Sequence, residues 1–231
     1  MLVEVGQLSN NERKRRHAAM PRPPSNADQA LLASGRSLYP LSGCAGLSVR
    51  RVAEHAGVQP GLFHYHFRNK NAFLAAVLQG LYEDAFAALS AAAAGPGPAV
   101  ARLGAVLRLV GDLLREHGAV IGRLVIDLAQ GEPAVADFVR ANAPRHLALL
   151  AGLMDEAERA GQIRPMPPLQ RMAFVMGAVA APLIVGRGLQ ALQPEHPLLA
   201  DRIGPDMLSA DATSARVDLV LTALRQGKEC A

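Results

Sequence analysis

Apolar side chains recur every three or four positions along most of the chain, the spacing that places them on one face of an α-helix. Proline and glycine interrupt this pattern, and alternation of apolar and polar residues never extends over the length of a useful strand. The pattern therefore predicts an all-α protein. Helices are expected at 26–39, 49–56, 60–67, 71–94, 99–117, 119–130, 133–160, 168–192 and 211–226, with an irregular segment from 193 to 209.

The segment from Leu47 to Phe67 predicts two short helices around a tight turn. The Ser48 hydroxyl can accept a hydrogen bond from an unpaired N–H group in the first helical turn. Gly57 can adopt the left-handed conformation that ends a helix, and Pro60 fits the first position of the next one. A helix pair of this size can insert its second helix into the major groove of DNA, so the segment makes the protein a candidate DNA binder.

The charge along the chain is uneven. Residues 1–80 contain ten Lys or Arg and four Asp or Glu, whereas residues 81–231 contain fourteen and sixteen. A basic first third indicates a module that binds a polyanion, although charge also fluctuates along any chain by chance. Residues 1–24 are polar, basic and interrupted by proline, so we expect a flexible arm. Its cations from Arg13 to Arg22 could follow the DNA backbone or enter the minor groove.

Cysteine and apolar content limit the class of protein. Half of the residues are hydrophobic, which is enough for a substantial core. Cys44 and Cys230 lack the spacing of a disulfide framework or a metal site, which fits a reducing environment. The longest apolar run, from 172 to 185, contains Pro182 and is shorter than the roughly 20 residues that span a bilayer. We expect a cytoplasmic protein without a signal peptide, metal or cofactor.

The second short helix carries several side chains suited to contact DNA. Gln59 and His64 can each donate and accept hydrogen bonds at base edges, and Tyr65 can donate to a phosphate. Phe63 and Phe67 are expected to anchor the helix in the core, which is the usual position of aromatic residues in a helix. The full set of expected DNA contacts is Ser48, Arg50, Gln59, Pro60, Leu62, His64, Tyr65 and Lys70.

Residues 31–74, about a fifth of the chain, resemble the DNA-binding region of the TetR/AcrR family of bacterial transcriptional regulators. The likeness keeps its spacing without a gap. It is carried by Tyr39 and Gly43, Ser48-Val49, Val52-Ala53, Ala56-Gly57-Val58, and Phe63-His-Tyr-His-Phe67 followed by Lys70. Arg36, Cys44 and His64 depart from the residues usual in the family, which affects the expected base preference more than the fold.

The resemblance implies a homodimeric regulator, in most such proteins a repressor, that a small ligand releases from a near-palindromic operator. It divides the chain into the arm at 1–24, a helix-turn-helix domain at 25–80 and a helical domain for ligand binding and dimerisation at 81–231. Helices 168–192 and 211–226 would pair across the dimer. An apolar helix buried within one chain is the alternative for 168–192.

The same resemblance implies an effector pocket among the C-terminal helices, and the apolar composition favours a mostly hydrophobic effector. For each apolar candidate a place in the core is the alternative reading. Arg123 and Asp127 also have the i, i+4 spacing of an ion pair within one helix. The main candidates are Leu114, His117, Arg123, Asp127, Met154 and Met176; further ones are Leu107, Val110, Leu124, Leu128, Phe138, His146, Leu150 and Phe174.

Two other classes of protein are less consistent with the sequence. A helical enzyme would need a catalytic arrangement, but His64 and His66 point to different faces of a helix. The Glu-His pairs at 54–55 and 116–117 lack the spacing of a zinc protease, and the chain has no phosphate-binding loop or nucleophile elbow. No catalytic residue is therefore expected. A helical ligand carrier without DNA binding would leave the basic arm and the helix pair unexplained.

Overall fold

The computed structural model describes residues 26–192 and 196–225, and this part of the chain is helical without strands. The predicted all-α fold is confirmed. The elements are α2 (Ala27–Gly46), α3 (Val49–Ala56), α4 (Pro60–His66), α5 (Lys70–Ala93), α6 (Ala99–Glu116), α7 (Gly118–Ala129), α8 (Pro133–Arg159), α9 (Pro168–Ala191), α10 (Pro197–Ala200), the π-helix η1 (Ile203–Leu208) and α11 (Ala210–Leu224). The predicted arm at 1–24 lies outside the described residues.

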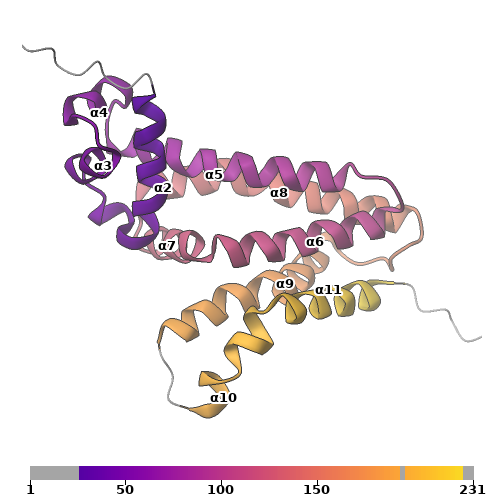
Figure 1. Ribbon diagram of the computed structural model, residues 1–231. Helices are drawn as coiled ribbons and strands as arrows, with labels where there is room; N and C mark the ends of the chain where they lie inside the picture. Colours follow the sequence, from indigo (N-terminus) through magenta and orange to yellow (C-terminus); the bar gives the residue numbers. More distant parts are fainter. Residues whose placement is uncertain (1–25, 193–195, 226–231) are drawn as a thin grey trace, which may run out of the picture.

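The helices α3 and α4 form one end of the molecule together with α2 (Figure 1). From that end α5, α6 and α8 extend as a long body, and α9, α10 and α11 lie along one side of it. The α5 helix contacts α2, α6 and α8, and so belongs to both parts.

Local signals in the sequence determine most helix ends. The Ser48 hydroxyl accepts from the N–H of Arg51, and Gly57 ends α3 in the left-handed region at φ 67°. Pro60 occupies the first turn of α4, and the Asn69 side chain caps α5 by accepting from Ala72. As a result, the helices predicted from 49 onward begin and end within two residues of their expected positions.

Two expectations about segments were wrong. The first helix does not stop at Pro40 but continues, and the break comes at Gly43, where φ is 61° and ψ is −168°. Pro40 lacks a backbone N–H, so the helix loses one hydrogen bond there but continues. At Gly43 the backbone leaves the helical region, and the helix is interrupted. The segment from 193 to 209 was expected to be irregular, yet its described part forms α10 and η1. Elements this short have too few turns to show a period in sequence.

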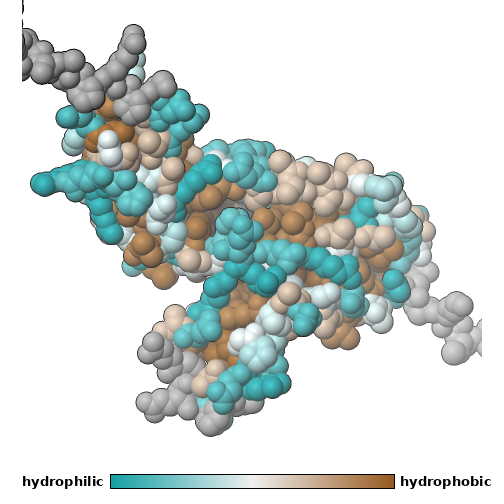
Figure 2. Space-filling view, viewed as in Figure 1, coloured by the Kyte–Doolittle hydropathy of each residue, from teal (hydrophilic) through white to brown (hydrophobic). Residues whose placement is uncertain are grey.

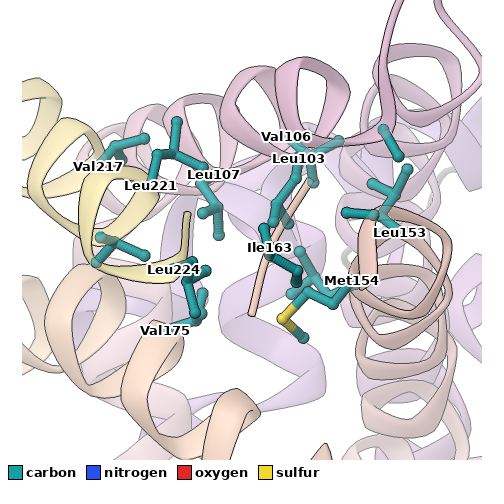
Figure 3. Close-up of a cluster of buried hydrophobic side chains, with 14 of the residues drawn as sticks. Leu103, Val106, Leu107, Leu153, Met154, Ile163, Val175, Val217, Leu221 and Leu224 are labelled. Atoms are coloured by element: carbon teal, nitrogen blue, oxygen red, sulfur yellow. The ribbon is translucent and has the colours of Figure 1, made fainter. Parts of the chain in front are cut away.

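Two clusters of buried side chains hold the fold together. The first lies under the N-terminal helices and includes Tyr39, Phe63 and Phe73, with Val135 contributed from α8. The second joins α6, α8, α9 and α11, and its labelled members in Figure 3 come from all four helices and from Ile163 in the connection between α8 and α9. Because α5 supplies Phe73 to the first cluster and Leu89 to the second, it connects the two packed regions.

A buried ion pair fastens α9 to α8. The guanidinium of Arg171 is 1% exposed and pairs with Asp155 and Glu158 of α8. A buried cation is tolerated only when it is paired, so these two carboxylates fix how α9 packs on α8.

Two helices, α5 and α9, are long and apolar enough to cross a membrane by length and composition alone. The apolar run from 172 to 185, which the sequence analysis found too short for a membrane span, lies within the longer α9 helix. Both helices also pack against several neighbours, α5 on α2, α6 and α8 and α9 on α6, α7 and α11. The core helix of a soluble protein passes the same test, and two such helices among the described residues are weak evidence for a membrane span.

Candidate DNA-binding surface and effector cavity

The second helix of the predicted pair presents polar rings to solvent. Tyr65 is 82% exposed, and His64 and His66 are exposed as well. On the opposite side of α4, Phe63 is fully buried against Phe73, with ring centroids 5.0 Å apart. Burial of Phe63 therefore fixes the orientation of α4 and keeps its polar face outside the core.

The other expected DNA contacts on this end of the molecule are also accessible. Ser48, Arg50, Gln59 and Pro60 are exposed, and Leu62 is half-buried. Hydrophilic residues cover much of this end in the space-filling view (Figure 2). The guanidinium of Arg50 is held 2.7 Å from Glu54, but both side chains are so exposed that the pair is weak and can exchange for a phosphate. All eight expected contacts are exposed or half-exposed, and all of them except Lys70 lie on α3, on α4 or at the N-terminal caps of these two helices.

Lys70 differs from the other seven. It is half-buried at the start of α5, and its Nζ donates to the carbonyl oxygen of Cys44 at 2.9 Å. The ammonium group thus binds the backbone that the Gly43 kink in α2 leaves unpaired. Its expected contact with DNA stays a prediction.

The same kink is held from a second direction by α7. The backbone N–H of Cys44 donates to Oδ2 of Asp127 at 3.0 Å, and the Asp127 carboxylate is fully buried. Oδ1 of Asp127 accepts from Nε of Arg123 at 2.9 Å and from Nη2 of the same residue. We call these contacts among Cys44, Asp127, Arg123 and Lys70 the kink clamp. The predicted ion pair within one helix is confirmed, and it has an additional partner in the N-terminal domain.

Electrostatics favour a charged carboxylate in this clamp. Burial opposes ionisation of Asp127, but hydrogen bonds from Arg123 and Cys44 outweigh it, so the pKa of Asp127 lies below its usual value. Burial and the adjacent carboxylate raise the pKa of the Cys44 thiol to about 12. They also raise the pKa of the buried Tyr39 hydroxyl well above its usual range. The thiol and the phenol are therefore neutral near neutral pH.

Gly43 is required by the clamp for two reasons. Its positive φ disfavours any side chain, and a Cβ there would overlap the guanidinium of Arg123. The Arg123 side chain therefore packs directly on the backbone of the N-terminal domain.

An open cavity of about 490 Å³ lies where α6, α7 and α9 meet α2. Its volume is within the range of small-molecule sites. Its polar side chains are Arg123 and Arg187. The remaining lining comes from Pro40, Leu114, Gly118, Ala119, Ile121, Gly122, Val125, Ile126, Leu183, Ile184, Gly188 and Ala191.

Only some of the expected effector contacts meet at this cavity. Leu114 and Arg123 line it, whereas Asp127 lies behind Arg123 in the clamp and His117 is half-buried outside the lining. Met154 is fully buried in the C-terminal core, and Met176 packs against that core. Among the further candidates, Leu107, Val110 and Leu150 are core residues of the same cluster, and Leu124 and Phe138 pack under the N-terminal helices.

Sequence reasoning missed the rest of the lining, including Arg187. The guanidinium of Arg187 lies against Gly118 at the start of α7 and donates to the carbonyl oxygen of Arg115 at the end of α6. A signal for this part of the cavity lay in α7, where apolar residues occur all around the helix. Such a helix has more apolar surface than one contact covers, and Val125 and Ile126 are indeed exposed.

His146 lies in a separate polar cluster between α5 and α8. Its Nδ1 is 3.3 Å from the hydroxyl of Tyr82, which donates to the carbonyl of Asn142 at 2.8 Å. Burial lowers the pKa of His146. Over the part of the chain that the structure describes, no group of three His, Cys, Asp or Glu side chains could hold a metal ion.

One face of α9 is apolar and uncovered. Exposed residues recur along it at helical spacing as Ala173, Phe174, Gly177, Ile184, Val185 and Gly188, of which Ile184 and Gly188 also border the cavity. The helix α11 contacts α9, and its Leu219 is 69% exposed in a hollow that Asp206, Asp211 and Arg216 also line. We call this the α9–α11 face. Uncharged stripes of this length on a monomer indicate an interaction surface.

Comparison with known proteins agrees with this geometry. Residues 31–77 match the family model described as bacterial regulatory proteins, tetR family. The match contains the kink in α2, the α3–α4 pair and the first turns of α5. No curated protein matches the chain closely enough to serve as a relative.

Solved structures share the fold over most of the chain. The transcriptional regulator FadR from Bacillus subtilis in complex with stearoyl-CoA is 14% identical, with 85% of this chain and 99% of that one covered and a TM-score of 0.66. A putative TetR-family transcriptional regulator from Rhodococcus sp. is 22% identical, with 87% and 100% covered and a TM-score of 0.63. The ketosteroid transcriptional regulator KstR2 of Mycobacterium tuberculosis is 16% identical, with 88% and 97% covered and a TM-score of 0.61.

These identities are low, so the structural likeness concerns the fold, while the family match rests on the N-terminal segment. Together they agree with the expectation of a regulator that is not an enzyme. Residues 31–77 match the model of the TetR family of bacterial regulatory proteins, within a chain that has the fold of solved TetR-family transcriptional regulators.

Proposed function

We propose that the protein is a ligand-responsive transcriptional repressor that binds a near-palindromic DNA operator as a homodimer in the cytoplasm. The observation that carries this proposal is the exposed polar face of α4, held outward by the buried Phe63. Gln59 and His64 are expected to contact base edges, Pro60 and Leu62 to contact apolar groups such as a thymine methyl, and Tyr65 to contact a phosphate.

The backbone contacts of the DNA would come from α3 and the arm. Ser48 and the N–H groups at the start of α3 can face a phosphate, and Arg50 can leave Glu54 for one. The arm at 1–24 would add basic contacts. We assign DNA binding to residues 25–80 and ligand binding and dimerisation to 81–231.

A homodimer is supported by the α9–α11 face. Pairing this face with that of a second copy would bury its uncharged stripe and place two α4 helices on one side of the assembly. Two recognition helices then engage half-sites about one turn of DNA apart. A near-palindromic operator follows from the twofold symmetry.

The cavity bordered by α6, α7 and α9 is the proposed effector site, and its apolar lining supports a mostly hydrophobic effector. FadR from Bacillus subtilis was solved with stearoyl-CoA, and KstR2 is described as a ketosteroid regulator. Stearoyl-CoA joins a long apolar acyl chain to an anionic carrier, and a ketosteroid is mostly apolar, so both descriptions fit an effector with a large apolar part.

Release from DNA would be a population shift. An effector that binds better to a conformation with a different spacing of the two α4 helices weakens operator binding by that difference in affinity. Because α5 belongs to both packed clusters, we expect it to transmit a change in the C-terminal helices to the α3–α4 pair.

DNA binding is tested by fluorescence anisotropy with labelled double-stranded DNA over a series of salt concentrations. The wild type should bind with an affinity that falls steeply with salt, and His64→Ala/Tyr65→Ala should lose at least tenfold. Arg159→Ala removes an exposed cation at the far end of α8 and is the matched control. Equal binding by the wild type and the double variant would refute the proposed surface.

A further inference from the structure

Arg123 belongs to two structures at once. Its guanidinium forms part of the cavity wall, and it also forms the ion pair of the kink clamp with Asp127. Through the other oxygen of Asp127 this pair holds the Cys44 N–H, which is part of the DNA-binding domain. The Asp127 carboxylate therefore joins the cavity wall to the matched N-terminal segment, in addition to Pro40, which lines the cavity directly from α2.

The hydrogen bonds of Arg123 leave room for a further partner. Nε and Nη2 both donate to Oδ1 of Asp127, and Nη1 has no hydrogen-bond acceptor among the described residues. The side chain is 22% exposed, so solvent or a ligand can reach it from the cavity. A guanidinium offers five N–H donors in a planar fork, which suits a carboxylate or a phosphate.

The charges of the cavity lining favour an anion. The lining contains two arginines, Arg123 and Arg187, and no acidic side chain. The Arg187 guanidinium donates to a backbone carbonyl and is paired with no carboxylate in the described chain. The surrounding walls are aliphatic, and they include Leu114, Ile121 and Ile184. An amphiphile with an anionic head and an apolar chain matches both features.

We propose that the effector is an anionic amphiphile whose head group competes with Asp127 for Arg123. As Arg123 turns toward the ligand, the buried Asp127 carboxylate loses its charge partner, so the arrangement in which it faces the Cys44 N–H becomes less stable. The α2 helix is then free to reposition the α3–α4 pair. This inference rests on the proposed function and specifies both the chemistry of the effector and the route of its signal.

The head group is tested with four probes that share a dodecyl chain: dodecanoate, dodecyl phosphate, dodecan-1-ol and dodecyltrimethylammonium, each below the concentration at which it forms micelles. Binding to the full chain is measured by isothermal titration calorimetry. The two anions should bind at least about tenfold more tightly than the alcohol or the cation, since a charge-assisted hydrogen bond is lost. A preference between the anions identifies a carboxylate or a phosphate. Equal binding of the cation would overturn the proposal.

The route is tested by measuring the affinity of the preferred anion for free protein and for DNA-bound protein, the DNA being a duplex selected by the wild type. The ratio of the two affinities is the coupling factor, expected to be about fivefold or more for the wild type. Asp127→Asn should bind the anion more tightly, because Arg123 no longer has a charged competitor, and should lower the coupling factor. Damage to the fold would lower both the anion affinity and the coupling factor. Competition at Arg123 instead raises the anion affinity and lowers the coupling factor.

Two further variants complete the design. Arg123→Gln/Asp127→Asn leaves no unpaired buried charge, so it should fold, bind the anion at least about tenfold more weakly and show a coupling factor near one. Arg187→Gln is the matched control on the same wall, since Arg187 has no contact with the clamp. This variant should bind the anion more weakly than the wild type but keep the wild-type coupling factor.

The outcomes distinguish this inference from the proposed function. If Asp127→Asn and the double variant keep the wild-type coupling factor, the competition at Arg123 is wrong even though DNA binding and ligand release stand. If the wild type binds no DNA under any condition, the proposed function itself fails.

Discussion

The backbone N–H of Cys44 donates to the carboxylate of Asp127 at 3.0 Å, across 83 positions of sequence. The bond exists because Gly43 turns the chain out of the helix and leaves the peptide groups beside it unpaired. Lys70 satisfies the carbonyl of the same residue from α5. The clamp therefore ties the kink in α2 to both α5 and α7.

Asp127→Ala should destabilise the protein by about 3 kcal/mol, because it leaves the Arg123 guanidinium and the Cys44 N–H without their partner. Chemical unfolding followed by circular dichroism measures the change. Asp137→Ala is the matched control, since Asp137 forms an ion pair with Arg140 in which both side chains are more than 70% exposed. The control should change stability by less than about 0.5 kcal/mol. Similar losses in both variants would contradict the importance of the clamp.

Tyr65→Phe and Tyr65→Ala test the phosphate contact. Tyr65 is 82% exposed, so neither change should alter the unfolding midpoint. Loss of the hydroxyl should weaken DNA binding by about 1 kcal/mol or more at any DNA sequence. Anisotropy titrations on specific and non-specific duplexes check this uniformity.

Lys70→Ala should behave differently from the tyrosine variants. It removes the donor to the Cys44 carbonyl, so it should lower stability by about 1 to 3 kcal/mol in addition to any effect on DNA affinity. Parallel unfolding and DNA titrations separate the two effects. A loss of DNA affinity with unchanged stability would mean that the hydrogen bond to Cys44 contributes little.

His146 should make stability depend on pH. Its folded pKa is lowered by burial, so the unfolded chain takes up the proton more readily. Its contribution to stability is complete above about pH 6.5 and is lost as the pH falls from there through the folded pKa. His146→Asn should flatten that part of the profile, measured by urea unfolding at several pH values. The exposed His55→Asn should leave the profile as in the wild type.

Val185→Glu should prevent dimerisation, because it places a charge on the apolar stripe of the α9–α11 face, where Val185 is 52% exposed. Sedimentation velocity should report a monomer, and binding to a two-half-site duplex should fall. Leu41→Glu alters an apolar residue that is 78% exposed on α2 and should leave the dimer intact. A wild type that is monomeric at every concentration would exclude the proposed pairing.

The sequence predicted the helices well because capping residues such as Ser48 and Pro60 act locally. It also predicted the exposed side of α4, since Phe63 and Phe67 mark the buried side. It could not predict the bond between Asp127 and Cys44, because contacts between distant segments leave no local signal. The sequence analysis also placed Met154 among the effector contacts, whereas the side chain lies in the core. A methionine in the core and one in a cavity look alike in sequence.

The proposed function requires sequence-specific recognition of double-stranded DNA by a symmetric dimer. Selection of bound sequences from a random duplex pool by the full chain measures this directly. We predict enrichment of a near-palindrome with half-sites about one helical turn apart. Recovery of a pool without enrichment, or of sites lacking twofold symmetry, would contradict it.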